Sequence, residues 1–133
     1  MINYLKPDKP GDFKEISVQG FAHIGDAVYE LMIRTWLCTT GTSTAKNLHK
    51  KAVTFVSAKA QAVAAEAILS SLDDEERAVY KRGRNAHLNS VPKGSTHDEY
   101  HAATGLEALF GYLYLDGRIN RLNELFEVVL ASS

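Results

Sequence analysis

The chain has 133 residues, of which 45% are hydrophobic and 23% charged, which is the composition of an ordinary globular protein of about one domain. Its formal net charge of −1 excludes nucleic-acid binding through bulk charge but not through a local basic patch. The single cysteine, Cys38, excludes an internal disulfide framework, and no apolar run approaches the ~18 residues that span a bilayer. Because the N-terminus also lacks the layout of a secretory signal, we expect one cytoplasmic domain over residues 1–133, without membrane contact.

Strand signals are scarce, and the sequence predicts an all-α fold. No long segment alternates strictly between apolar and polar residues, and the three prolines lie outside the periodic segments. After a loose segment at 1–12, the pattern predicts helices at about 18–38, 44–70 (with a candidate break near Ser57), 73–84, 96–115 and 118–130.

Two helix starts carry a specific capping pattern. Asp73 precedes Glu76 by three residues, and Thr96 precedes Glu99 by the same spacing, so each pair can satisfy free amide groups at a helix N-terminus. Between these two helices, the turn-forming residues of 85–96 predict a surface loop.

The first predicted helix carries a polar stripe on an otherwise apolar surface, so most of the helix is expected to be buried. At about 100° per residue, one narrow side holds Gln19, His23, Asp26, Glu30 and Arg34. One interpretation is a solvated face on which Glu30 and Arg34 form an i, i+4 ion pair. The stripe alone therefore does not identify Asp26 as functional.

Glu107 lies on a more apolar helix side than Asp26, and this makes a functional role for the two acids more plausible. Its side of the predicted helix is shared by Tyr100, Ala103, Phe110, Gly111 and Tyr114. A carboxylate on a packed surface is costly unless it is paired, hydrogen-bonded or bound to a metal. An ion pair with a distant Arg or Lys, or a position at the edge of the core, would satisfy this requirement.

A third interpretation joins the two acids across a helix crossing. Gly25 is next to Asp26 and Gly111 lies one turn after Glu107, and each glycine costs ~1 kcal/mol of helix propensity that close helix approach would justify. Two facing carboxylates repel each other unless a cation lies between them, and such all-oxygen ligation suits Mg²⁺ or Mn²⁺. The sequence thus suggests a metal site for phosphoryl chemistry.

A basic run precedes the helix that carries Glu107. Residues 80–97 contain Lys81, Arg82, Arg84 and Lys93 and no acidic residue, whereas residues 73–76 are four consecutive acids. Such a run is often only a solvated surface or a protein-binding loop. Beside a pair of carboxylates, it favours a substrate with a phosphate backbone.

Three motifs, HIGDAVYEL, RGRNA and ATGLEALFGYLYL, resemble those of Mini-ribonuclease III, the short bacterial relative of ribonuclease III. The resemblance covers the chain from about Val18 to Leu125 and implies a helical ribonuclease III catalytic fold without a double-stranded-RNA-binding domain. It further implies a homodimer and Mg²⁺-dependent cleavage of double-stranded RNA, with Mn²⁺ as a substitute. The implied task is maturation of the large-subunit ribosomal RNA precursor, with a large-subunit ribosomal protein as a candidate further partner.

The resemblance assigns roles to particular residues. Asp26 matches the catalytic aspartate and Glu107 the metal-binding glutamate, so both are candidate catalytic and metal-binding residues. Larger ribonuclease III enzymes carry acids where this chain has Gln19, Ala22 and Thr104, which leaves more of the metal's coordination shell to water and RNA phosphate.

The predicted RNA-binding residues are Arg82, Arg84, Asn85 and Lys93. His23, Glu30 and Asp98 are weaker candidates for supporting roles. Two alternatives remain at this point, a non-catalytic module of the same fold that binds RNA or the ribosome, and a helical domain whose acids are only structural.

Overall fold

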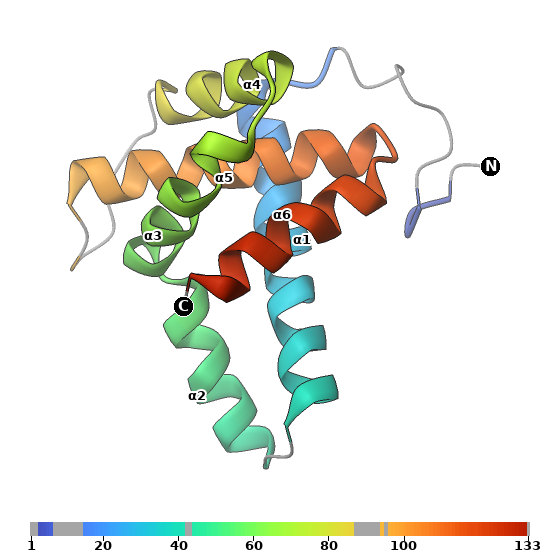
Figure 1. The fold of residues 1–133 in the computed structure, drawn as a ribbon, viewed down its shortest axis with the longest axis vertical. Coiled ribbons are helices and arrows are strands. Elements are labelled where there is room, and N and C mark those ends of the chain that lie inside the picture. The colour runs from blue at the N-terminus through green and yellow to red at the C-terminus, as the bar shows by residue number, and fades with distance from the viewer. Residues whose placement is uncertain (1–2, 7–14, 42–43, 87–93, 95, 133) are drawn as a thin grey trace.

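The computed structural model describes residues 3–6, 15–41, 44–86, 94 and 96–132, which form helices and contain no strand (Figure 1). The helices are α1 (Val18–Thr40), α2 (Ala45–Val56), α3 (Ala58–Ile68), α4 (Asp74–Arg84), α5 (His97–Leu115) and α6 (Ile119–Ala131), with a 3₁₀ turn at Leu69–Ser71. The all-α prediction is confirmed. Most of the predicted segment 1–12 and of the loop 85–96, including Lys93, lies outside the described residues.

Side-chain caps set the helix boundaries that the sequence predicted. Both capping boxes are present, Asp73 with Glu76 at α4 and Thr96 with Glu99 at α5. The candidate break near Ser57 is confirmed, because the Ser57 hydroxyl accepts a hydrogen bond from the Ala60 amide at 3.2 Å and starts a new helix. The α2 and α3 segments meet there at a bend of 58°.

The core forms where α5 runs across α1, with α3 and α6 covering the remaining sides (Figure 1). Tyr29 of α1 is 1% exposed and packs edge-on against Phe110 of α5 and Phe126 of α6, at ring-centroid distances of 5.3 and 6.2 Å. Completely buried aliphatic side chains from α1, α3, α5 and α6 fill the space around these rings, among them Ile33, Ile68, Leu106, Leu109 and Leu125.

Glycine allows α1 and α5 to touch through their backbones. A Cβ atom at Gly25 would lie 1.6 Å from the Glu107 carbonyl oxygen, and one at Gly111 would lie 1.9 Å from the Phe21 carbonyl oxygen. Both distances are far inside van der Waals contact, so neither position accepts a side chain without separating the helices. The close approach that the sequence suggested for these two glycines is confirmed.

A second glycine contact allows α4 to pack closely on α5. A Cβ atom at Gly83 would lie 2.6 Å from the Ala108 Cβ, and one at Gly105 would lie 2.8 Å from the Tyr80 carbonyl oxygen. The C-terminal half of α4 therefore packs directly on the turn of α5 that contains Glu107.

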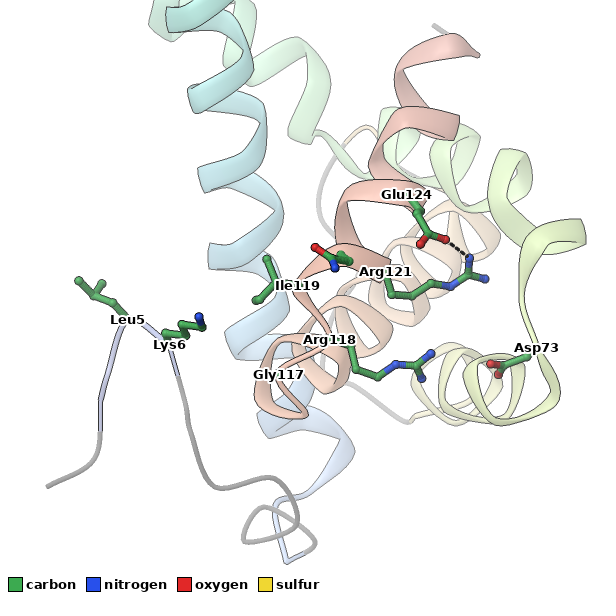
Figure 2. A pocket seen from close by; sticks show the side chains of 9 residues that line it. Leu5, Lys6, Asp73, Gly117, Arg118, Ile119, Arg121 and Glu124 are labelled. Carbon is green, nitrogen blue, oxygen red and sulfur yellow. Dashed lines mark hydrogen bonds and ion pairs between the residues drawn. The ribbon is translucent and has the colours of Figure 1, made fainter.

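The start of α4 is fixed by a buried ion pair. Glu76 is completely buried, and its two carboxylate oxygens accept hydrogen bonds from the Arg121 guanidinium, each at 2.8 Å. The Arg121 hydrogen bond lowers the pKa of Glu76, despite the opposing effect of burial. Arg118 lies 3.6 Å from the same carboxylate, and Figure 2 shows Arg118 and Arg121 extending from the start of α6 towards α4.

Helix α1 is less completely buried than its composition indicated. Leu31 is 63% exposed, and Ala27 is also exposed. Trp36 is half-buried, with its ring packed edge-on against Phe55 of α2 at 5.2 Å. The C-terminal part of α1 contacts mainly α2, so it extends beyond the core and keeps one apolar side open (Figure 1). Within the described part of the chain, no single helix is long and apolar enough to span a membrane.

We expect Gly25→Ala to destabilise the protein by at least ~2 kcal/mol. Overpacking typically costs ~1–3 kcal/mol, and here the obstacle is backbone, which outweighs the ~1 kcal/mol that alanine adds in helix propensity. Urea unfolding followed by circular dichroism measures the change. Gly20→Ala, on the same helix, is the matched control, because its Cβ would meet side-chain atoms of Ile16 and Ser17 and no backbone of another helix. A Gly25→Ala protein as stable as the wild type would contradict the close contact.

Candidate functional site

The helix crossing brings the two predicted acids together. Asp26 follows Gly25 on α1. Glu107 is the residue of α5 whose carbonyl oxygen limits the space at Gly25. Asp26 is exposed and Glu107 is half-buried, so the pair lies at the edge of the core and opens to solvent on the α1 side. Two residues 81 positions apart in the chain thus form one acidic site.

The environment of Glu107 opposes ionisation. Burial, the negative charge of Asp26 and a hydrogen bond with Asp26 together raise the pKa of Glu107 to about 8. No ion pair of Glu107 with an Arg or Lys occurs among the described residues, and such a pair would have lowered this pKa. Of the interpretations that the sequence allowed, the ion pair is not found among the described residues, whereas Glu107 lies at the edge of the core and also meets Asp26 across the helix crossing.

The rest of the polar stripe on α1 is a solvated face. Gln19, His23 and Arg34 are exposed, and Arg34 pairs with Glu30 at 3.2 Å as the i, i+4 spacing predicted. Such an exposed pair contributes at most a few tenths of a kcal/mol, on the order of 0.3–0.5. Asp26 differs from its neighbours on the stripe because it faces a second carboxylate.

The positions at which larger ribonuclease III enzymes carry further acids are occupied here by side chains with other contacts. Ala22 is buried, and the Thr104 hydroxyl donates a hydrogen bond to the Tyr100 carbonyl oxygen within α5 at 3.0 Å. Asp98 is exposed in the first turn of α5. The described residues contain no cluster of three or more His, Cys, Asp and Glu side chains arranged to hold a metal.

Gln61, which the sequence interpretation missed, borders the acidic pair from α3. It is 2% exposed, and its Nε2 donates to the Val56 carbonyl oxygen at 3.2 Å. A hydrogen bond from Gln61 to Glu107 opposes, without cancelling, the rise in the pKa of that carboxyl. Its Oε1 is buried and has no hydrogen-bond partner within the described structure. The only signal in the sequence was one amide in an alanine-rich helix, which does not distinguish a site residue from a core residue.

These groups suit a small, hard divalent cation. Mg²⁺ prefers oxygen ligands and is commonly held by one or two carboxylates, with water and substrate phosphates completing its shell. Asp26 and Glu107 supply two carboxylates. The Gln61 side-chain oxygen is a further acceptor that has no hydrogen-bond partner within the described structure. The donor set therefore fits the cation that the resemblance implied.

Two of the predicted RNA-binding residues flank Gly83, the glycine at the contact between α4 and α5. Arg82 and Arg84 are exposed on either side of the buried Gly83, and the Arg84 guanidinium lies 5.9 Å above the Tyr80 ring. Asn85 caps the C-terminus of α4 and is exposed. The motif RGRNA thus places two cations at the surface beside the α5 turn of Glu107, while Lys93 lies outside the described residues.

A groove of about 910 Å³ lies elsewhere, at the turn from α5 to α6 (Figure 2). Its most prominent cation, Arg121, is already bound to Glu76 and to Glu124, the latter at 3.0 Å. Neither Asp26 nor Glu107 lines this groove, and its two arginines, Arg118 and Arg121, hold α4 against α6 through Glu76.

Comparisons with known proteins identify the family of the chain. Residues 19–118 match the Ribonuclease III domain family. The chain is 46% identical over 107 residues to a Mini-ribonuclease 3 of Thermoanaerobacter sp. (strain X514), which covers 80% of this chain and 75% of that protein. It is 42% identical over 116 residues to the Mini-ribonuclease 3 of Enterococcus faecalis, which covers 86% of this chain and 88% of the relative.

The fold is also found in a solved structure. A crystal structure of a protein from Fusobacterium nucleatum superposes with a TM-score of 0.82 at 31% sequence identity, covering 90% of this chain and 96% of that chain. With the family match over residues 19–118 and the identities above, the resemblance read from the three motifs is confirmed. The chain therefore belongs to the ribonuclease III family, in its Mini-ribonuclease III group.

Proposed function

We propose that this endoribonuclease of the ribonuclease III family acts on double-stranded RNA, depends on Mg²⁺ and uses Asp26 and Glu107 as its catalytic, metal-binding residues. The observation that carries the proposal is the approach of these two carboxylates at the α1–α5 crossing. Burial and the nearby Asp26 raise the pKa of Glu107, and no cationic side chain among the described residues pairs with it. Mn²⁺ has the same preference for oxygen ligands and would substitute.

Asp26 and Glu107 would hold the cation between α1 and α5. When bound, the cation polarises the scissile phosphate and lowers the pKa of the water that attacks it in line. Glu107 must lose its proton before it can act as a ligand, because only the ionised carboxylate binds a metal well. Water is the nucleophile, and the exposed Cys38 at the far end of α1 has no part in the reaction.

The basic end of α4 would hold the RNA backbone beside this pair. Arg82 and Arg84 present exposed guanidinium groups next to the α5 turn of Glu107, and Asn85 adds an exposed amide. Lys93, in the following segment, is proposed for the same role from the sequence alone. Contacts of this kind recognise the shape and backbone of double-stranded RNA more than its sequence.

We further propose that the chain works as a single catalytic domain that forms a homodimer. The family resemblance supports two sites related by a two-fold axis, one for each RNA strand, and two-fold pairing is the commonest association of identical chains. Open apolar side chains at Leu31, Val53 and Val63, each more than half exposed, are surface that a partner could cover.

The biological task is a proposal for this chain that rests on the family resemblance of its sequence motifs. By that analogy, the substrate is the large-subunit ribosomal RNA precursor, processed in the cytoplasm, and a large-subunit ribosomal protein is a candidate partner that presents it. The alternative, a non-catalytic RNA-binding or ribosome-binding module of the same fold, is disfavoured because both acids are present and lie together.

Asp26→Asn and Glu107→Gln should each abolish cleavage of duplex RNA while leaving RNA binding largely intact. Each substitution keeps the side-chain volume and removes a charge that holds the cation. Gel assays with Mg²⁺ measure cleavage, and a binding assay in Ca²⁺ or without metal measures RNA affinity. Glu30→Gln is the control, because that acid is paired with Arg34 on the solvated face. A folded Asp26→Asn protein that cuts at the wild-type rate would end the catalytic assignment.

The same variants have an expected effect on stability. The raised pKa of Glu107 means that the folded protein keeps a proton that the unfolded chain releases near pH 4.5, so metal-free stability should fall as pH rises from about 4.5 to about 8. Glu107→Gln should remove this fall and be the more stable protein at pH 8. Saturating Mg²⁺, at about 100 times its Kd, should stabilise the wild type by ~2.7 kcal/mol and the variant much less. Thermal melts across pH, with and without Mg²⁺, test both expectations.

Arg82→Ala, Arg84→Ala and Lys93→Ala should each weaken duplex RNA binding and reduce its salt dependence by about one counterion, without changing stability. Lys46→Ala is the matched control, since Lys46 is an exposed cation on α2, at the opposite end of the molecule from α4 (Figure 1). Fluorescence anisotropy at several salt concentrations gives both quantities. Wild-type affinity and salt slope in all three variants would show that the basic run is only a solvated face.

Sedimentation at micromolar concentration should show a dimer of the 14.7 kDa chain. Leu31→Glu should shift the equilibrium to monomer if the open side of α1 lies in the interface, because it would bury an unpaired charge. Ala131→Glu, at an exposed position at the end of α6, is the matched control. A wild type that sediments only as a monomer would contradict the proposed dimer.

A further inference from the structure

Gln61 occupies a position at which an apolar side chain would satisfy the packing. It is one of only three polar or charged residues among the described buried positions, with Glu76 and Thr104. Glu76 is held by arginine and Thr104 by a backbone carbonyl, so both have complete hydrogen bonding. Gln61 does not, because its Oε1 is buried without a partner, a condition that typically costs ~1–3 kcal/mol.

The orientation of the Gln61 amide is set by its surroundings. Val56 is the last residue of α2, and its carbonyl oxygen requires a donor, which Nε2 supplies at 3.2 Å. The same amide also contacts the Glu107 carboxyl by a hydrogen bond. Since a carbonyl oxygen and a carboxylate both require donors, the NH₂ group must face them, and Oε1 is left as the unpaired acceptor.

The two acids cannot supply the donor that Oε1 lacks once a cation has ionised both of them. Ionised Asp26 and Glu107 are acceptors only, so neither can pair with Oε1 when a cation is bound. A hydrated divalent cation brings water, which donates hydrogen bonds to oxygen atoms around a site. A buried, unpaired oxygen on an amide that contacts Glu107 therefore fits a site that is completed on cation binding.

We propose that Gln61 is a positioning residue of the Asp26–Glu107 site, which orients the Glu107 carboxylate through its NH₂ group and offers Oε1 to water that enters with the cation. This inference rests on the proposed metal-dependent function. Gln61 compensates for the few acids in this site, because it anchors Glu107 without adding a third negative charge. Its placement depends on the α2–α3 break, because Val56 ends α2 and leaves its carbonyl oxygen to the Gln61 amide, five residues later in α3.

The test compares Gln61→Met, which keeps length and removes both hydrogen-bonding groups, with the wild type. Mn²⁺ affinity, measured by electron paramagnetic resonance without RNA, should fall about tenfold or more, as is typical for groups that orient metal ligands. Metal-free stability should change little, because the unpaired oxygen is lost together with the hydrogen bonds. Asn123→Leu is the matched control, since Asn123 donates to the Ile119 carbonyl oxygen at 3.2 Å on α6, away from the acids.

A second measurement needs no variant. Titration of the wild type with Mg²⁺ should shift the NMR resonances of the Gln61 side-chain amide, and those of Asn123 should stay in place. Unchanged Gln61 resonances during saturable Mg²⁺ binding, or wild-type Mn²⁺ affinity in Gln61→Met, would overturn the role of Gln61 and leave the proposed function standing. A wild type that binds neither cation would overturn both.

Discussion

The contact between the backbones of α1 and α5 is the constraint on which the rest of the structure depends. Gly25 and Gly111 remove the side chains that would hold the helices apart, and the carbonyl oxygens of Glu107 and Phe21 fill the space. Helices normally pack with their axes ~8–10 Å apart, and the distance falls when small residues form the contact. Because Asp26 is next to Gly25, this contact also fixes the distance between the two acids. Packing and site are therefore set by the same residues.

Two buried or half-buried glutamates show how the protein treats negative charge in opposite ways. Glu76 is completely buried but receives two hydrogen bonds from Arg121, and its pKa is lowered. Glu107 is less buried, faces Asp26 instead of a cation, and its pKa is raised to about 8. The first arrangement stabilises the fold by joining α4 to α6. The second costs stability, and such a cost is typical of sites at which a bound cation later supplies the missing positive charge.

The second glycine contact links this site to the basic surface. Gly83 lets α4 lie against Gly105 and Ala108 of α5, so the flanking arginines are held at the surface by a rigid helix and not by a loop. A site built on helices is positioned more precisely than one built on loops. The sequence RGRNA thus has a physical explanation, in which glycine makes the contact with α5 and the arginines stay at the surface, where we propose that they bind phosphate.

The sequence by itself determined the local structure. The caps at Asp73 and Thr96 and the break at Ser57 all depend on residues within a few positions, and the structure has each of them where the pattern placed it. The glycine beside Asp26 and the one after Glu107 were also informative, because glycine inside a helix has a cost that only a close contact explains.

Tertiary structure alone decided which polar groups meet. The stripe on α1 could not show that Glu30 pairs along its own helix whereas Asp26 pairs across a crossing, because both have the same periodicity. It could not show that Arg121 would reach Glu76, or that Gln61 would turn towards Glu107 from a third helix. Periodicity assigns a residue to a face of its own helix, but the partner that this face meets is set by how the helices cross, and that depends on packing over the whole chain.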